Sequence, residues 1–470
     1  MSGRPARVVV AGAGPAGFYV AINLLRLFGP SGVRVDVLER LPVPFGLVRF
    51  GIAPDHAHTR AVTSRFDRAV RDHGDALRVH VNAGVRTQLG REGVPVNELM
   101  RASDALVLCT GLSAEPGYGD GRRHDQQQRL RGVLDAREVV DWYNGHPYAR
   151  ADVGETLRNV LHSEDARGVA VLGVGNVALD IARMLALDPV SLSRTDAAPA
   201  AIEVLSSGSD FPRLVHMIGR RSLAQASFTP KEVRELLSLL SARVTSGNDD
   251  GLAIDATDEI VMRENRIRKR ALEAVRKHVT SPPSPAQDSQ PTREVRMHFR
   301  RTPIDIVEDE VRSGHVGGIR LRVTPPASAE GERVGGESHD HVQKEEFLRC
   351  GAVIRAFGYR GTPVAGVPWD ETKGTVPTVA GGRVVAGDDH TVVPGLYASG
   401  WLRRGASGII ATNVTDAEEV AAAVHHDFMS GILRDDENGN GNEENDSVLN
   451  VLKLHGIGDD IYNVASVRAS

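Results

Sequence analysis

Two short stretches of this 470-residue chain share one pattern, in which an apolar run leads into a glycine turn and then into an apolar helical segment. The first is VVVAGAGPAG at residues 8–17, and the second is VAVLGVGNVALD at residues 169–180. A Gly-x-Gly turn between a strand and a helix is typical of β-α-β units that bind a dinucleotide, because bare backbone and a helix N-terminus accept a pyrophosphate. Two such units predict an α/β fold.

The first glycine turn contains three glycines, each with a separate role. Gly12 permits the tight turn, Gly14 lets the backbone approach a pyrophosphate, and Gly17 lets the helix pack closely on the strand. The flanking apolar patterns predict the rest of the unit: a strand over Arg7–Ala11, a helix over Phe18–Phe28 and a strand over Val33–Leu38.

Glu39 follows the second predicted strand, at the spacing where dinucleotide-binding units carry an acidic residue. Its carboxylate would accept hydrogen bonds from a ribose diol and would repel a 2′-phosphate. The first turn therefore fits FAD or NAD and not NADP. The alternative is a glycine-rich turn without a ligand, and the position of Glu39 argues against it.

The second turn keeps Gly173 and Gly175 and has Ala178 at the third position, which is a permitted variant. Its return strand ends in Arg220-Arg221 instead of an acidic residue. Guanidinium groups match a phosphate in charge and in forked geometry, so this pair predicts a 2′-phosphate and hence NADP(H). The alternative is a pair of arginines on a solvated surface.

Buried strand patterns resume after the second unit, which indicates that one domain is inserted in the other. The remaining ordered elements that we expect are a helix over 176–187 and strands over Arg213–Ile218, Ala105–Thr110, Gly351–Ala356 and 392–401. The segments expected as connections are the polar stretch 190–212, the charged stretch 245–295 with TSPPSPAQDSQPT, and the acidic stretch RDDENGNGNEENDS at 434–447.

We therefore predict an α/β protein with two Rossmann-like dinucleotide-binding domains, the NADP domain inserted in a discontinuous FAD domain. The FAD-binding domain is expected over 1–112 and 351–433, and the NADP-binding domain with its linkers over 113–350. An acidic linker and a C-terminal element complete the chain over 434–470.

Composition restricts the partners. The formal net charge of −5 gives no general attraction to nucleic acid or to an anionic membrane, and no apolar stretch approaches the roughly 18 residues of a membrane span. The first residues lead directly into a strand, so we expect a cytoplasmic protein. Cys109 and Cys350 are too few for a four-thiolate iron–sulfur site, and both lie in apolar runs typical of buried small side chains.

Several longer motifs resemble the adrenodoxin-reductase-like NADPH:ferredoxin reductases over about residues 7–425. PFGLVRFGIAPDH (44–56) is similar to the family's flavin-side segment, and WYNGHP (142–147) to its interdomain segment. GNVALDIARML (175–185) and GRRSLAQASFTPKEVREL (219–236) resemble its NADP-binding motifs, and GWLRRGASGIIATN (400–413) its C-terminal FAD motif. The resemblance implies FAD and NADP(H) as cofactors.

The resemblance also implies roles for individual residues. His56 and Asp180 would orient polar groups near the flavin and the nicotinamide, with Glu235 a further candidate there. The implied FAD contacts are Gly14, Pro15, Glu39, Leu47, Trp401, Gly408, Ile409 and Ile410. The implied NADP(H) contacts are Asn176, Val177, Arg220, Arg221 and Glu232, with Gly408 shared between the nucleotides.

Together these features predict an enzyme that passes electrons from NADPH through FAD to a separate ferredoxin-like iron–sulfur protein. Ferredoxins that serve a cytochrome P450 are among the candidate acceptors, and we expect a monomer or weak oligomer. Arg49, Arg60, Arg403 and Arg404 are candidates for steering an acidic partner. The chain has Ala406-Ser407, Ala411 and Val414 where the family usually has other residues. These departures leave a small molecule or dioxygen open as the acceptor. A separate alternative is a redox-sensing or interaction module without catalysis.

Overall fold

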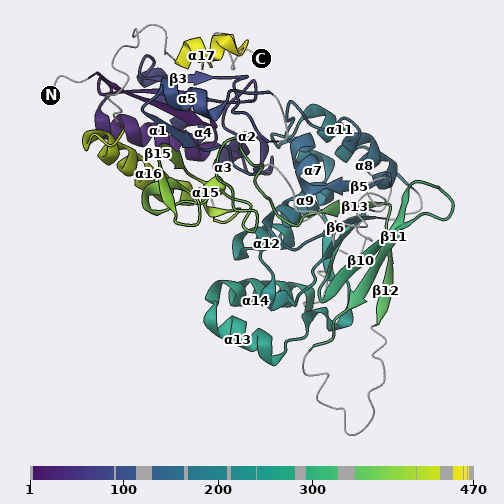
Figure 1. Cartoon of the computed structure of the whole chain (residues 1–470). Helices are drawn as coiled ribbons and strands as arrows, with labels where there is room; N and C mark the ends of the chain where they lie inside the picture. Colours follow the sequence, from purple (N-terminus) through teal and green to yellow (C-terminus); the bar gives the residue numbers. More distant parts are fainter. Residues whose placement is uncertain are drawn as a thin grey trace. The chain divides into compact units, whose positions relative to one another are not determined.

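The chain forms two compact units, which Figure 1 shows in a computed structural model. One unit comprises Met1–Ile52, His58–Pro116 and Gly358–Ser470, and the other comprises Ala53–Ala57 and Gly117–Phe357. The structure describes residues 4–88, 92–112, 130–163, 168–208, 213–239, 241–280, 293–326, 344–408, 410–433, 448–458, 460–462 and 464. The first unit is thus discontinuous in sequence, as a nested arrangement requires.

The first unit is built on a six-stranded sheet with the order β14-β15-β4-β1-β2-β3. All neighbours are parallel except β14 and β15, which form an antiparallel pair at one edge. The valine-rich sequence of β1 is buried on both faces, as expected for a central parallel strand. The strands are β1 (Ala6–Ala11), β2 (Val33–Leu38), β3 (Leu77–His80), β4 (Ala105–Leu108), β14 (Arg383–Ala386) and β15 (Thr391–Ala398).

Helices cover this sheet, and the longest two, α1 and α16, pack against each other beside it (Figure 1). Apolar side chains of both helices share one buried cluster with β1 and β2, which explains why the N-terminal and C-terminal parts of the chain form one unit. The helices are α1 (Pro15–Phe28), α2 (Leu47–Phe50), α3 (Ala57–Arg60), α4 (Thr63–Asp72), α5 (Val96–Ala102), α15 (Trp401–Arg404), α16 (Thr412–Met429), α17 (Val448–Leu454) and the 3₁₀ turn η5 (Ala380–Gly382).

The second unit has its own six-stranded sheet, with the order β5-β13-β6-β7-β9-β8 and parallel neighbours throughout. A separate antiparallel sheet, β10-β11-β12, lies in the same unit. The strands are β5 (Val133–Asp135), β6 (Val169–Leu172), β7 (Arg213–Ile218), β8 (Arg243–Ser246), β9 (Arg293–His298), β13 (Ala352–Arg355), β10 (Arg301–Glu308), β11 (Val316–Val323) and β12 (Glu345–Arg349).

The helices of the second unit bury their apolar stripes in a single cluster with the parallel strands. They are α7 (Ala136–Tyr143), α8 (Val153–Leu161), α9 (Asn176–Ala186), α10 (Pro189–Leu192), α11 (Pro199–Ser206), α12 (Pro230–Leu237), α13 (Ala256–Glu264), α14 (Arg266–Thr280) and the 3₁₀ turns η1 (Leu223–Gln225) and η2 (Asp249–Leu252). In the part of the chain that the structure describes, no helix combines the length and the apolar character needed to span a membrane.

The placement of one predicted strand was wrong. The apolar run Gly351–Ala356 forms β13, but β13 pairs with β5 and β6 in the second unit, and the chain returns to the first unit only after Phe357. A short apolar run satisfies the requirements of either parallel sheet, so its sequence alone carries no information about its partners.

The two stretches expected as connections contain helices. Residues 190–212 include most of α10 and all of α11, and residues 245–295 include α13 and α14. In α14 the buried stripe is narrow, with Ala271, Leu272 and Val275 among many charged residues, so the helical signal in this stretch is weak. The predicted connections at 281–292 and 434–447, and the linker after Leu112 up to residue 129, lie outside the described residues.

Candidate functional site

The first glycine turn has the geometry of a pyrophosphate cradle. Gly12 has φ of 116°, and a Cβ atom on Gly17 would overlap the carbonyl oxygen of Gly12. Gly14 is the N-cap of α1 and Pro15 begins the helix. A Cβ on Gly14 would meet no atom within 4 Å, so open space adjoins the helix N-terminus, where the helix dipole favours an anion.

Glu39 follows β2 and is buried. Its carboxylate accepts the N–H groups of Ala13 (3.1 Å) and Leu41 (3.0 Å), so it is held against the glycine turn itself. Burial raises the pKa of Glu39, and the backbone hydrogen bonds only partly offset this effect. The carboxyl group thus lies where the fingerprint requires a ribose partner.

The other candidate FAD residues come from two distant segments of the first unit. Leu47 begins α2, directly after Gly46. A Cβ atom on Gly46 would lie 3.2 Å from the Cα atom of Gly14, so Gly46 lies close to the glycine turn. Trp401 begins α15 and lies with its ring centroid 5.7 Å from that of Tyr359. Gly408 has φ of 83°, and Ile410 packs on the core. Ile409 lies outside the described residues.

The second glycine turn repeats the backbone of the first. Gly173 has φ of 136°, and Gly175 is the N-cap of α9 in an extended conformation. The Oδ1 atom of Asn176 accepts the N–H of Thr229 at 3.0 Å, so this side chain connects the turn to the segment before α12. Val177 packs against the apolar core.

Three charged side chains near the end of β7 and the start of α12 have unmet binding capacity. Arg220 and Arg221 are exposed, and within the described residues neither guanidinium has an ion pair. The Oε2 atom of Glu232 is buried and lacks a hydrogen-bond partner in the described part of the chain. Two free guanidinium groups next to a glycine turn suit a phosphate, and a buried acceptor suits a hydroxyl or amide donor.

A cluster of polar side chains in the second unit includes the three residues predicted to be catalytic. The Nε2 atom of His56 lies 2.8 Å from the Glu235 carboxylate, to which it donates when Glu235 is ionised. Arg183 is buried and donates to Asp55 (2.5 and 3.0 Å) and to Asp180 (2.7 Å). A weaker contact of 3.9 Å joins Arg183 to Glu235, so the Arg183 ion pairs and the His56–Glu235 pair form one cluster.

The two aspartates of this cluster differ in their proton affinity. Burial raises the pKa of Asp180, and the nearby Arg183 opposes this only in part. For Asp55 burial also acts to raise the pKa, but the hydrogen bonds and charge of Arg183 outweigh it and lower the pKa overall. Asp55 is therefore the ionised partner of the guanidinium, and Asp180 is the carboxyl group that takes up a proton more readily.

The structure thus brings His56, Asp180 and Glu235 together, and it adds Asp55 and Arg183, which the sequence analysis missed. Asp55 directly precedes His56. Arg183 follows Asp180 by three residues, so Asp180 and Arg183 lie on one face of α9. That spacing was a usable signal, since a charged residue on the buried side of a helix needs a partner.

The arginines proposed to steer a partner have internal contacts. Arg403 forms ion pairs with Asp416 and Glu419, both at 3.0 Å. Arg404 donates to Asn413 and Arg60 to the carbonyl of Ile52, while Arg49 lies over the Phe45 ring. The acceptor-facing role of these four side chains therefore remains a prediction.

Cys109 and Cys350 are buried free thiols, as predicted. Burial raises the pKa of the Cys350 thiol to about 12, so it is not a reactive thiolate at neutral pH. In the described ranges, no group of three or more His, Cys, Asp and Glu side chains could hold a metal ion.

Comparison with known proteins gives one consistent result. The chain is 37% identical over 443 residues to the mitochondrial NADPH:adrenodoxin oxidoreductase of Arabidopsis thaliana, covering 93% of this chain and 85% of the relative. It is 32% identical over 424 residues to the NADPH-ferredoxin reductase FprA of Mycobacterium tuberculosis, covering 88% and 82%. No family model matches the sequence.

The solved structure of Mycobacterium tuberculosis FprA in complex with NADPH superimposes with a TM-score of 0.73 at 30% identity, covering 91% of this chain and 85% of that one. The similarity therefore extends over both units. The predicted resemblance is confirmed, and the chain belongs to the NADPH:adrenodoxin oxidoreductase family.

Proposed function

We propose that this protein transfers electrons from NADPH through FAD to a ferredoxin-like iron–sulfur protein. The observation that carries the proposal is the pairing of two dinucleotide turns of opposite selectivity in one chain, with Glu39 at the first and Arg220-Arg221 at the second. Family membership at 37% identity supports the same conclusion.

The first unit would hold FAD. The open space at Gly14 and the N-terminus of α1 suit its pyrophosphate, and Glu39 suits its ribose. Leu47, Trp401 and the segment from Gly408 to Ile410 would line the rest of the cofactor. FAD supplies the ability to accept a hydride and release electrons one at a time.

The second unit would hold NADPH. The N-terminus of α9 suits the pyrophosphate, and Arg220 and Arg221 would bind the 2′-phosphate. Glu232, with its unpartnered buried oxygen, would accept a hydrogen bond from the nucleotide. NADH lacks the 2′-phosphate, so the two exposed guanidinium groups would contribute nothing to its binding.

The cluster around Arg183 would orient the reacting end of the nucleotide. Glu235 holds the His56 ring in one orientation, and Arg183 holds Asp55 and Asp180 in place. We propose that His56 and Asp180 present their polar atoms to the nicotinamide and its surrounding water, and that Glu235 fixes the tautomer of His56.

The acceptor is proposed to be a separate protein, since two buried cysteines cannot hold a four-thiolate cluster. The test is NADPH-dependent reduction of cytochrome c by the FAD-loaded protein, with and without an added ferredoxin. Reduction that requires the ferredoxin supports the proposal. Equally fast reduction without it, or rapid NADPH consumption by dioxygen alone, would favour the small-molecule acceptor that the exposed Ala406-Ser407 departure suggests.

A cytoplasmic location and a monomeric or weakly oligomeric state complete the proposal. The Arabidopsis thaliana relative is named as mitochondrial, so the location needs a direct test. Cell fractionation should recover the protein in the cytoplasm, and sedimentation at micromolar concentration should give the mass of one chain. Recovery in an organelle or a stable dimer would contradict these two parts of the proposal.

A further inference from the structure

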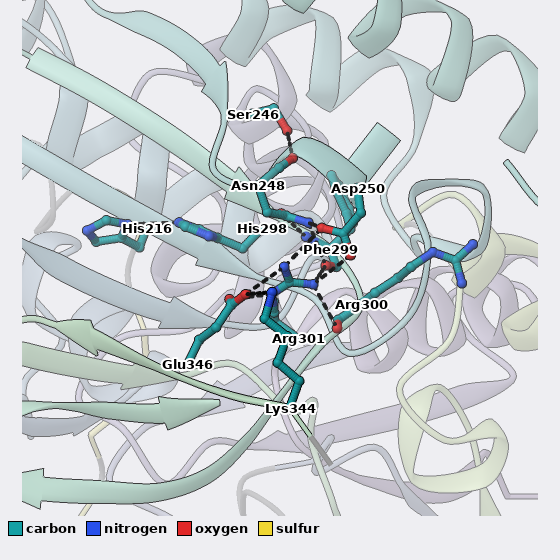
Figure 2. A network of polar contacts seen from close by, with 10 residues as sticks. All are labelled: His216, Ser246, Asn248, Asp250, His298, Phe299, Arg300, Arg301, Lys344 and Glu346. Atoms are coloured by element: carbon teal, nitrogen blue, oxygen red, sulfur yellow. Dashed lines mark hydrogen bonds and ion pairs between the residues drawn. The ribbon is translucent and has the colours of Figure 1, made fainter. Parts of the chain in front are cut away.

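The loop that carries the two exposed arginines is tied to the end of the neighbouring strand. We call Gly219–Ser222 the phosphate loop. The N–H of Gly219 donates to the carbonyl of His298 at 2.7 Å, and the carbonyl of Gly219 accepts the N–H of Arg301 at 3.0 Å. Figure 2 shows His298 and Arg301 on either side of the connection from β9 to β10. The start of the phosphate loop is therefore fixed by backbone hydrogen bonds.

The next anchor is Arg300, in the same connection. Its φ is 57°, a left-handed conformation that is uncommon for a residue with a side chain. In this conformation its N–H donates to the carbonyl of Arg221 at 2.9 Å. A strained backbone persists only where the surrounding contacts enforce it, and the Arg300 side chain supplies such contacts.

The Arg300 guanidinium is buried between two carboxylates. Its Nη2 atom donates to Asp255 at 2.9 Å and to Asp258 at 2.7 Å. These two aspartates are the N-cap and third residue of α13 and form its capping box, so their positions are set by the helix. Arg300 is thus fixed by a buried helix terminus.

Asp258 also holds the far end of the phosphate loop. It is fully buried, and its Oδ1 atom accepts a hydrogen bond from the hydroxyl of Ser222, the residue directly after Arg221. One carboxylate therefore binds Ser222 with one oxygen and Arg300 with the other. The phosphate loop is held at Gly219, at the Arg221 carbonyl and at Ser222.

Charge is distributed unequally between this support and the loop that it holds. Arg300 is paired with two aspartates, and Arg301 with Asp250 (2.9 Å) and Glu346 (2.7 Å), as Figure 2 shows for the latter. The guanidinium groups of the phosphate loop have no ion pair in the described part of the chain. The support is internally neutralised, so its arginines do not compete for an anion.

We propose that Ser222, Asp258 and Arg300 are positioning residues that set the selectivity for NADPH over NADH. They hold the backbone of the phosphate loop so that both of its arginines face the 2′-phosphate at once. The inference rests on the proposed binding of the 2′-phosphate by Arg220 and Arg221. Bidentate recognition of a phosphate depends on geometry, and a loop free to move would lose it.

The test compares binding of 2′,5′-ADP, which carries the 2′-phosphate, with binding of 5′-ADP, which lacks it, by calorimetry on the FAD-loaded protein. Ser222→Ala removes one hydroxyl and leaves the buried ion pairs intact. Asp258→Asn removes the charge at nearly constant shape. Each should weaken 2′,5′-ADP binding about tenfold, which corresponds to about 1.4 kcal/mol, and should change 5′-ADP binding less than about twofold.

Two further variants complete the design. Ser222→Thr keeps the hydroxyl and should restore most of the affinity lost in Ser222→Ala. Arg296→Ala lies on β9 but contacts Glu294 and not the phosphate loop, so it should leave the binding of both nucleotides unchanged.

The outcomes separate the inference from the proposed function. Equal weakening of 2′,5′-ADP and 5′-ADP, or unchanged 2′,5′-ADP binding in both variants, would overturn the positioning role. If Arg220→Ala/Arg221→Ala itself leaves 2′,5′-ADP binding unchanged, the 2′-phosphate assignment fails as well. If that double variant loses binding while the Ser222 and Asp258 variants keep it, only the further inference fails.

Discussion

The two glycine turns have almost the same backbone at the N-cap glycine and very different surroundings. The N-cap glycine has φ and ψ of −81° and −176° in Gly14, and −99° and 178° in Gly175. At the third position the first turn has Gly17 and the second has Ala178, which is buried. The shared geometry serves a pyrophosphate and carries no information about which nucleotide is bound.

The difference lies where the second strand of each unit ends. In the first unit a buried carboxylate, Glu39, is held by backbone N–H groups of the turn. In the second unit two exposed guanidinium groups belong to the phosphate loop, whose backbone is held by hydrogen bonds that involve Arg300 and Asp258. Selectivity for the ribose or its 2′-phosphate is therefore separable from recognition of the pyrophosphate, and each can be altered independently.

Exchange of the third turn residue should give the largest effect. In Gly17→Ala the new Cβ would overlap the backbone oxygen of Gly12, so α1 must move away from β1, at a cost of about 3 kcal/mol or more. The reciprocal change Ala178→Gly should cost only about 1 kcal/mol from helix propensity. Urea unfolding and the FAD content per chain measure both; a Gly17→Ala protein with normal stability and full FAD would show that the two turns do not differ as described.

Removal of the two positive charges that distinguish the second turn should give the second largest effect. Arg220→Ala/Arg221→Ala deletes two charge-assisted contacts worth about 1.5–3 kcal/mol each, so the KM for NADPH should rise by about 100-fold or more. The KM for NADH should stay almost unchanged, because NADH has no 2′-phosphate. Steady-state kinetics with both nucleotides provide the measurement, and equal losses would place the 2′-phosphate elsewhere.

A smaller difference between the units should appear in acid. His216 and His298 are buried neighbours 2.9 Å apart in the second unit, and burial followed by nearby positive groups lowers their pKa values to about 3 and about 4. Below the ordinary histidine pKa of about 6.5 the unfolded chain binds more protons, so stability is complete above that pH and falls as the pH drops toward 4.

In the first unit the acid-sensitive group that we compare with these histidines is the carboxylate of Asp427. Burial alone would raise the pKa of Asp427, but its hydrogen bonds to Arg383 and Tyr397 lower it to about 2. Its contribution is present above pH of about 4 and is lost only as the pH falls toward 2. Acid titration followed by hydrogen exchange in each unit should therefore show the second unit opening first, between pH 6.5 and 4. First opening of the first unit would contradict the difference.

Sequence periodicity predicted the parts of the fold that local contacts determine. The strands Val33–Leu38 and Arg213–Ile218 have the expected bounds, and the helix predicted from 176 ends at Ala186. Sheet membership depends on long-range pairing, so β13 was assigned to the wrong unit. The three-stranded sheet β10-β11-β12 was missed because charged residues alternate with the few apolar residues in parts of its strands. Helices α13 and α14 were missed because many charged residues surround their few apolar ones.

The candidate site was predictable where a motif fixes both residue type and position. The structure places His56 against Glu235 although 179 positions separate them, and only the family motifs indicated that pair. The ion pair between Asp55 and Arg183 was missed because a contact between distant segments leaves no periodic pattern, although the i, i+3 spacing of Asp180 and Arg183 was a usable signal. Arg300 was missed for a similar reason, since its role comes from a left-handed backbone and two buried aspartates.

The most direct test of the account is an anaerobic titration of the FAD-loaded protein with NADPH and with NADH, followed by the visible absorption of the flavin. We predict that NADPH bleaches the flavin band at concentrations far below those needed with NADH, and that Arg220→Ala/Arg221→Ala removes most of this difference. A flavin that NADPH does not bleach, or that both nucleotides bleach equally well in the unmodified protein, would contradict the assignment of the two turns.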